Sequence, residues 1–228
     1  MEDTTSKRLS ASGYTAFFDL DGTIIKAISG TELAKGAWKR GLMKVTDLIQ
    51  AIYLSLAYKF GIKDPLLIVN KMTAWVKGLP EETFEKLCLD VYNDVLLPSL
   101  HREAGPEINM HKEKGAKVVI LSSSLAPLCR KIAAHLGFDD ILCSELETVD
   151  GILTGFPTGK LCFGDEKLTR LKDYCEKNNS TLQEAWYYAD ADSDLPVLSI
   201  VGVPVCVNPE RKLAKIARQN GWKIYKWG

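Results

Sequence analysis

The sequence predicts an α/β fold in which helices cover both faces of an open parallel sheet, giving three layers. Apolar runs at residues 15–19, 117–122 and 185–190 have the length and composition of buried parallel strands. Helical patterns separate the later runs, and such alternation is typical of doubly wound sheets. Residues 29–101 contain amphipathic helical patterns but no good strand, which predicts an all-helical insertion after the first strand.

The elements after the second strand are predicted from their start and stop signals. Residues 127–136 carry a helical pattern that stops at Gly137, and residues 166–177 carry another before the third strand. Two short β-prone pieces around Asp150 and Gly151 predict a hairpin.

The remaining elements lie in the insertion and at the end of the chain. Residues 202–208 read as a fourth strand, and residues 211–228 read as a basic amphipathic helix followed by a final strand. The insertion carries four helical patterns, at residues 31–40, 45–60, 65–77 and 81–96. The predicted organisation is a flexible tail (1–13), a core domain (14–28 and 102–228) and a helical cap domain (29–101).

Composition limits the classes of partner and compartment. The 29 basic and 29 acidic residues give a net charge of zero, which offers no electrostatic case for nucleic acid or an anionic membrane surface. The six cysteines form no CxxC pair, which favours free thiols in a reducing compartment. The first residues are polar, and the most apolar helical stretch is too short for a membrane span. We therefore expect a cytoplasmic protein.

Polar residues follow each of the three predicted strands where it ends. Asp19 ends the first strand with Asp21 two places on, Ser122 ends the second, and Asp190 ends the third with Asp194 nearby. The carboxyl ends of parallel strands meet at one edge of a sheet, and ligands bind there. We therefore expect these side chains to converge.

Each of these residues alone has an ordinary structural explanation. A serine after a strand usually caps a helix, loop acids often do the same, and a lysine such as Lys167 at a helix start is usually solvated. The combination is different, because four acids at one edge would repel each other without a cation. Mg²⁺ is the usual hard cation beside phosphate, so the pattern predicts a magnesium site.

Four motifs in order resemble the haloacid dehalogenase-like hydrolase superfamily, and within it the phosphoserine phosphatase-like subfamily IB. They are DLDGT from Asp19, VVILS ending at Ser122, GDEKLTRL with Lys167 rather than Lys160, and ADADSDLPVL containing Asp190. The resemblance implies a Rossmann-like core with a C1-type cap at residues 29–101, and activity as a phosphoric monoester hydrolase.

The resemblance also implies a role for each site residue. Asp19 would attack the phosphoryl group and form an aspartyl-phosphate, and Asp21 would act as general acid and then general base. Asp19, the main-chain carbonyl of Asp21, and Asp190 would hold Mg²⁺. Gly22, Ser122, Ser123 and Lys167 would bind the substrate phosphate, with Asp194 in support.

Departures from the family pattern bear on the substrate. Ser123 and Ser124 replace the Gly-Gly of true phosphoserine phosphatases. The segment after the first motif, IIKAISG, lacks the acid that would recognise a substrate ammonium, and Glu32 is too far along. We expect a small phosphorylated metabolite other than phosphoserine. Phosphotransfer or phosphomutase activity, and a non-catalytic binding module, are the alternatives; a monomer and a homodimer are equally compatible.

Two further predictions concern residues to which the motifs give no role. Surface or capping positions are expected for His101, His111 and His135, which show no metal-ligand spacing. Ala189 and Asp192 depart from the fourth motif and are assigned to a solvated turn.

Overall fold

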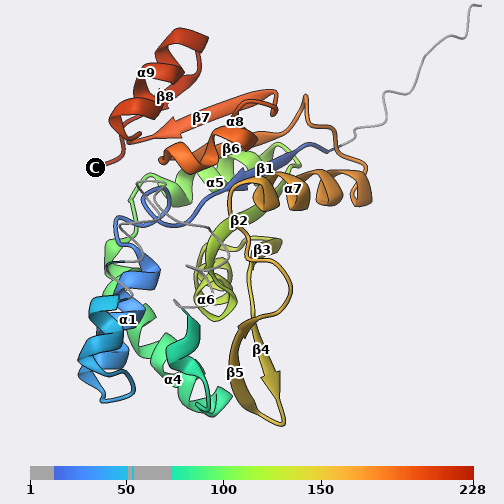
Figure 1. Ribbon diagram of the computed structural model, residues 1–228. Helices are drawn as coiled ribbons and strands as arrows, with labels where there is room; N and C mark the ends of the chain where they lie inside the picture. Colours follow the sequence, from blue (N-terminus) through green and yellow to red (C-terminus); the bar gives the residue numbers. More distant parts are fainter. Residues whose placement is uncertain (1–12, 51–52, 54–72) are drawn as a thin grey trace, which may run out of the picture.

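The computed structural model describes residues 13–50, 53 and 73–228, and its centre is a six-stranded sheet (Figure 1). All neighbouring strands are parallel, in the order β3-β2-β1-β6-β7-β8. The predicted α/β fold is therefore confirmed. The strands are β1 (Thr15–Phe18), β2 (Lys117–Leu125), β3 (Asp140–Ser144), β6 (Trp186–Ala189), β7 (Val203–Val207) and β8 (Lys223–Tyr225).

The sequence analysis did not predict β3, and among the predicted strands β2 differs most from its prediction. This strand continues to Leu125, so Ser122 lies within it rather than at its end. Its pairing with β1 stops at Ile120, and its pairing with β3 shifts register between Leu121 and Leu125. Ser122 therefore lies beyond the regular ladder, at the edge where β1 has already ended.

Helices cover both faces of the sheet (Figure 1). The side chains of the sheet and the helices form two separate apolar layers, one on each face. Alternation along β1 sends Ala16 and Phe18 into one layer and Phe17 into the other. Full burial of a side chain such as Phe17 contributes roughly 2–3 kcal/mol to folding. One layer packs against α5 (Ala104–Glu113) and α6 (Ala126–Leu136), and the other against α7 (Asp165–Lys177), α8 (Leu195–Leu198) and α9 (Arg211–Asn220).

Of the four longer helices α5, α6, α7 and α9, three match the sequence analysis and one was missed. α6 ends where predicted, because Gly137 adopts the left-handed conformation with φ of 73°. α7 and α9 also lie where their patterns predicted. The sequence analysis did not assign α5, whose first turn contains Gly105 and Pro106 and obscures the amphipathic pattern.

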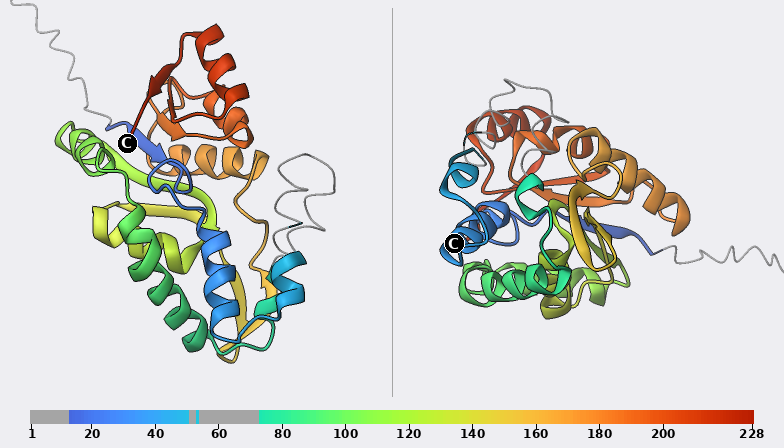
Figure 2. Two further views of the ribbon diagram at one scale, coloured as in Figure 1. Left: turned by 90° about the vertical axis from the view of Figure 1, so that its left-hand side faces the viewer. Right: turned by 60° about the horizontal axis from the view of Figure 1, so that its bottom comes forward.

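The described residues between β1 and α5 form helices and turns, as predicted. They comprise α1 (Ser29–Lys39), a helical stretch at 45–50, η1 (Ala74–Val76), α4 (Glu81–Val91), η2 (Tyr92–Leu96) and η3 (Leu97–Ser99). α1 and α4 pack closely (Figure 2), because a Cβ built on Gly36 would meet Val91 at 2.8 Å, and Arg40 forms an ion pair with Asp90 at 3.0 Å. Most of the predicted helices 45–60 and 65–77, and the predicted tail apart from residue 13, lie outside the described residues.

The chain enters and leaves this helical segment at one place. The main-chain nitrogen of Lys26 donates to Ser99 O at 2.9 Å, and that of His101 donates to Ile24 O at 3.0 Å. Ile25 also forms a bridge with Leu100. The two connections therefore run side by side from the sheet edge.

The predicted hairpin around Asp150 and Gly151 is confirmed. β4 (Leu146–Val149) and β5 (Ile152–Pro157) pair antiparallel, and both turn residues have positive φ, 50° and 76°. The hairpin contacts the helical segment, because Gly78 N donates to Leu153 O and Leu153 N donates to Leu79 O, each at 2.9 Å.

The histidine prediction is wrong for two of the three residues. His111 is fully buried and His101 is 6% exposed, whereas His135 is exposed. The imidazole of His111 hydrogen-bonds Tyr14 Oη through Nδ1 at 2.8 Å and Tyr188 Oη through Nε2 at 2.7 Å. Both ring nitrogens of His111 therefore have hydrogen-bond partners, which allows this polar side chain of α5 to be buried.

Burial of His111 predicts acid sensitivity. Desolvation, followed by the charges of Lys114 and Lys223, lowers the imidazole pKa from 6.5 to about 4. Between those values the unfolded chain binds the extra proton, so stability is retained above pH 6.5 and lost as the pH falls toward 4. We expect this site to remove roughly 3 kcal/mol of unfolding free energy by the acid end of that window. Urea unfolding at stepwise pH would show a flatter dependence in His111→Gln. The exposed-site control His135→Gln should follow the wild type, and parallel curves for all three proteins would contradict the prediction.

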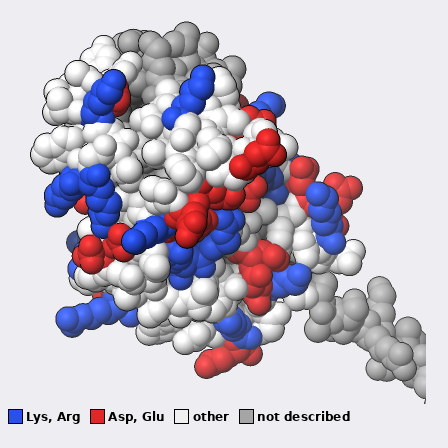
Figure 3. All heavy atoms as spheres, turned by 90° about the horizontal axis from the view of Figure 1, so that it is seen from below, with Lys and Arg blue, Asp and Glu red and all other residues white. Residues whose placement is uncertain are grey.

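Two surface observations complete the fold. Within the described residues, no helix is long and apolar enough to cross a membrane. On the face seen in Figure 3, Lys and Arg side chains lie beside Asp and Glu side chains rather than in regions of a single sign.

Candidate active site

The strand register brings two of the predicted acids together at the carboxyl edge of the sheet. Phe18 pairs with Tyr188, and Asp19 N donates to Tyr188 O at 2.9 Å. Asp19 therefore leaves β1 beside the end of β6, where Asp190 follows Ala189. Residues distant in sequence meet here because parallel strands place equivalent ends side by side.

A tight turn follows Asp19 and redirects the chain. Leu20 O accepts hydrogen bonds from the main-chain nitrogens of Ile24 and Ile25 at 2.9 and 3.0 Å, and Gly22 N donates to Ile25 O at 2.8 Å. Gly22 has φ of 76°, and a Cβ built on it would overlap the Asp190 carboxylate. Glycine is therefore required both by the backbone conformation and by this close approach.

Replacement of Gly22 by alanine should destabilise the fold more than positive φ alone explains. Gly41 is a matched control, with φ of 70° and no atom within 4 Å of a built Cβ. We expect Gly41→Ala to lower the unfolding free energy by roughly 1 kcal/mol and Gly22→Ala by at least about 2 kcal/mol. Denaturant titration measures both, and equal losses would show that the contact with Asp190 costs nothing.

Lys167 lies buried between two carboxylates. Its Nζ is 3.0 Å from Asp19 Oδ1 and 2.6 Å from Asp194 Oδ1, and its side chain is 3% exposed. Tyr187 Oη donates to Asp194 Oδ1 at 2.5 Å and accepts from Lys167 Nζ at 3.2 Å. Asp194 and Tyr187 thus fix the ammonium against Asp19. Lys160, the other lysine considered, is exposed.

Burial and mutual repulsion dominate the electrostatics of the acids. Desolvation, then the charges of Asp19 and Asp194, raises the pKa of Asp190 to about 8. Desolvation also raises the pKa of Asp19, although Lys167 opposes the shift. Burial alone would lower the pKa of the Lys167 ammonium, but Asp19 and Asp194 raise it above its ordinary value. Lys167 is therefore protonated. Its single positive charge does not offset the burial and mutual repulsion that raise the pKa values of Asp19 and Asp190.

Asp21 is held differently from Asp19. Ser29 N donates to its Oδ1 at 3.0 Å and Ser29 Oγ donates to its Oδ2 at 2.9 Å. Desolvation, then the charge of Asp19, raises the pKa of Asp21 to about 7, against these hydrogen bonds. A carboxyl group with a pKa near neutrality can both release and take up a proton.

The serines of β2 alternate in exposure. Ser122 and Ser124 are buried, and Ser122 Oγ donates to Ser124 Oγ at 3.3 Å. Ser124 Oγ in turn lies 2.7 Å from Ser29 Oγ. Ser123 points the other way and is exposed, so it lies apart from this chain of hydroxyl groups.

The sequence analysis missed several residues that touch the predicted acids. Ser29 and Tyr187 contact Asp21 and Asp194 as described above, and Thr23 Oγ1 donates to Asp190 Oδ1 at 3.2 Å. Thr23 belongs to the DLDGT motif, which was a signal for its role. Ser29 and Tyr187 carried no such signal, because an isolated serine or strand tyrosine is ordinary.

The assignment of Ala189 and Asp192 to a solvated turn is wrong in part. Ala189 is fully buried as the last residue of β6. Asp192 lies in η4 (Asp192–Asp194), where its Oδ2 pairs with Lys212 Nζ at 3.3 Å at the surface. Its Oδ1 is buried and receives no hydrogen bond from the residues that the structure describes.

The donor set fits a hard divalent cation. Carboxylate and carbonyl oxygens are the ligands that Mg²⁺ prefers. Burial, followed by the charges of neighbouring carboxylates, raises the pKa values of Asp19 and Asp190, and a bound cation would oppose both effects. Asp19 Oδ1 is buried and, within the described part of the chain, receives no aligned hydrogen bond. The described residues contain no ready group of three His, Cys, Asp or Glu side chains for a metal. The predicted magnesium ligands include only two side chains, those of Asp19 and Asp190, because Asp21 would contribute its main-chain carbonyl.

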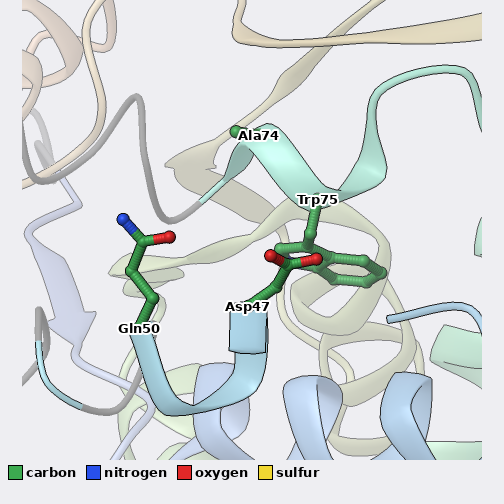
Figure 4. A pocket seen from close by; sticks show the side chains of 4 residues that line it. All are labelled: Asp47, Gln50, Ala74 and Trp75. Atoms are coloured by element: carbon green, nitrogen blue, oxygen red, sulfur yellow. The ribbon is translucent and has the colours of Figure 1, made fainter. Parts of the chain in front are cut away.

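A separate small pocket lies in the helical segment (Figure 4). It has a volume of about 130 Å³ and is lined by Asp47 and Gln50 on one side and Ala74 and Trp75 on the other. One carboxylate beside an indole and an amide offers no acid–base pair. The pocket includes none of the predicted site residues.

The chain is similar over most of its length to several known proteins. Phosphoserine phosphatase SerB1 of Mycobacterium tuberculosis is 26% identical over 213 residues, covering 92% of this chain and 69% of that protein. Histidinol-phosphatase of Neisseria meningitidis is 26% identical over 214 residues, covering 92% of this chain and 96% of that protein. A crystal structure of a protein of unknown function from Bordetella pertussis shares the fold, with a TM-score of 0.83, 23% identity, and coverage of 93% and 98% of the two chains.

The match to a family model covers the sheet edge and all the predicted acids. The model describes haloacid dehalogenase-like hydrolases and matches residues 16–199, most of the chain. Together with the parallel sheet and the motif order, this match establishes that the chain belongs to the haloacid dehalogenase-like hydrolase family.

Proposed function

We propose that this protein is a Mg²⁺-dependent phosphatase that hydrolyses a small phosphomonoester through an aspartyl-phosphate on Asp19. The observation that carries the proposal is the buried arrangement in which Lys167 Nζ lies 3.0 Å from Asp19 Oδ1 and 2.6 Å from Asp194 Oδ1. A carboxylate beside a fixed cation can accept a phosphoryl group whose charge that cation offsets.

Asp19 and Asp21 divide the chemistry between them. Asp19 attacks phosphorus while the ester bond breaks, and the leaving oxygen takes a proton from Asp21. Asp21 then removes a proton from the water that hydrolyses the aspartyl-phosphate. The pKa of about 7 for Asp21 supports both steps, because neither protonation state is costly near neutral pH.

The remaining residues hold the phosphate and balance its charge. Lys167, the Ser122 hydroxyl and the main chain around Gly22 would contact the phosphoryl oxygens, and exposed Ser123 would reach a substrate from the solvent side. Asp194 keeps Lys167 in position. Asp19, the Asp21 carbonyl and Asp190 would hold Mg²⁺, which supplies positive charge beside the transferring phosphoryl oxygens when bound.

Residues 29–101 are proposed to be the cap domain, and the rest of the described chain the core. The paired connections at Ile25 and Leu100 support a segment that covers the site as one unit and excludes bulk water during the first step. Residues 26–28 bring no acid to the site, which argues against recognition of the ammonium of phosphoserine. Two relatives are named phosphoserine phosphatase and histidinol-phosphatase, so small phosphomonoesters are the class of substrate to test.

A phosphate-release assay tests the proposal. The protein would be incubated with Mg²⁺ and a panel of para-nitrophenyl phosphate, phosphoserine, histidinol phosphate and sugar phosphates, with and without a chelator. We expect release from at least one ester, loss of release with chelator, and recovery on adding Mg²⁺. No release from any ester would favour a non-catalytic module. Phosphate appearing on an added alcohol rather than in solution would favour phosphotransfer.

A further inference from the structure

Ser29 connects the helical segment to the proposed proton donor. It is the first residue of α1 and is 1% exposed. Its main-chain N–H reaches Asp21 Oδ1 at 3.0 Å and its hydroxyl reaches Oδ2 at 2.9 Å. A single residue thus holds both carboxylate oxygens of Asp21 and fixes the plane of the carboxyl group.

The position of Ser29 is itself set from two sides. The connection before it is anchored by the hydrogen bond from Lys26 N to Ser99 O at 2.9 Å. On the other side, Ser124 Oγ lies 2.7 Å from Ser29 Oγ. Ser29 gives its one hydroxyl proton to Asp21, and the Ser124 hydroxyl also hydrogen-bonds the Asp21 carboxyl group. β2 and the segment entry therefore hold Ser29 rigidly against Asp21.

We propose that Ser29 is a positioning residue for proton transfer by Asp21, an inference that rests on the proposed function. In the first step the phosphorus–oxygen bond of the ester breaks and its electron pair goes to the leaving oxygen. That oxygen takes the proton of the Asp21 carboxyl group, while phosphorus bonds to an Asp19 oxygen. Asp21 becomes a carboxylate in this step, and hydrogen bonds from Ser29 to a carboxylate are stronger than those to a neutral acid. Ser29 therefore stabilises the transition state more than the ground state.

Leaving-group dependence separates positioning of an acid from general structural damage. Ser29→Ala keeps the main-chain donor and removes the hydroxyl. The substrates would be para-nitrophenyl, phenyl and para-methoxyphenyl phosphate, which have similar shape but increasingly poor leaving groups. A nitrophenolate departs with little help, whereas the methoxyphenolate needs the proton. We expect kcat/KM of Ser29→Ala to fall about twofold on the nitrophenyl ester and at least tenfold on the methoxyphenyl ester.

Three further variants complete the test. Ser29→Thr keeps a hydroxyl and should return the slope of activity against leaving-group pKa toward that of the wild type. Ser124→Ala leaves Ser29 in place but removes its anchor, and should give a smaller loss with the same trend. Ser99→Ala is the matched control, because among the described residues its hydroxyl donates to Leu96 O at the other connection and not to a site residue; it should keep the wild-type slope.

The outcomes distinguish this inference from the proposed function. Equal losses on all three esters in both Ser29→Ala and Ser124→Ala, or no loss in either, would overturn the positioning role. Absence of phosphate release by the wild type, or full release by Asp19→Asn, would instead overturn the proposed function.

Discussion

Asp19→Asn is expected to abolish phosphate release, by a factor of about 10³ or more, because the amide cannot form the covalent intermediate. We expect kcat to fall while the stability of the fold stays close to that of the wild type. The substitution removes one of several crowded acids, whose charge is among the causes that raise the pKa values of Asp21 and Asp190. We therefore expect the melting temperature to stay within a few degrees of the wild type.

Acid quenching during turnover gives an independent measurement. With a radioactive phosphate ester, the wild-type peptide containing Asp19 should carry the label, and the Asp19→Asn peptide should carry none. Asp173→Asn is the matched control, because Asp173 is exposed on α7 and undergoes the same chemical change. Wild-type turnover in Asp19→Asn, or a label on another peptide, would remove Asp19 from the role of nucleophile.

Lys167→Met is expected to reduce both activity and stability. The substitution leaves Asp19 and Asp194 buried without their cation, and breaking a buried ion pair typically costs about 3–5 kcal/mol. Activity should fall at least about 10²-fold, since the cation that faces the phosphoryl oxygens is lost. Denaturant unfolding and phosphate release measure the two effects separately.

Two variants make the Lys167 prediction specific. Lys160→Met changes an exposed lysine close in sequence and should leave both quantities near the wild-type values. Adding Asp194→Asn to Lys167→Met removes one stranded charge and should recover part of the stability without recovering activity. A Lys167→Met protein as stable as the wild type would show that Asp19 and Asp194 are neutral or otherwise compensated in the fold.

Much of the fold follows from local sequence signals. The strands around Phe17 and Tyr187 are short, apolar and followed by acids, and their period-two alternation matches the two apolar layers. Gly137 and the Asp150-Gly151 pair mark a helix end and a hairpin by their own conformational preferences. Such features depend on neighbouring residues and can therefore be predicted from one sequence.

The parts that escaped prediction depend on contacts between distant residues. The burial of His111 requires Tyr14 and Tyr188 as partners, and nothing near His111 in sequence indicates them. The contact of Ser29 with Ser124 likewise forms only when β1 and β2 pair. The helix α5, which contains Gly105 and Pro106, was also missed, because these two residues give a poor local helix propensity that tertiary packing overrides.

The strand order also determines when the central sheet and the candidate site can form during synthesis of the chain. β1 is made first but lies at the centre of the sheet, where Ala16 pairs with Val118 on one side and Trp186 on the other. Asp19 therefore has no neighbouring Asp190 until nearly the whole chain has left the ribosome. Strand pairings between residues far apart in sequence slow folding. Until β2 and β6 have been synthesised, the apolar strand β1 lacks both of its neighbours in the sheet. A premature stop before β6 would leave a chain that contains Asp19 but lacks Asp190 and the strands β6, β7 and β8.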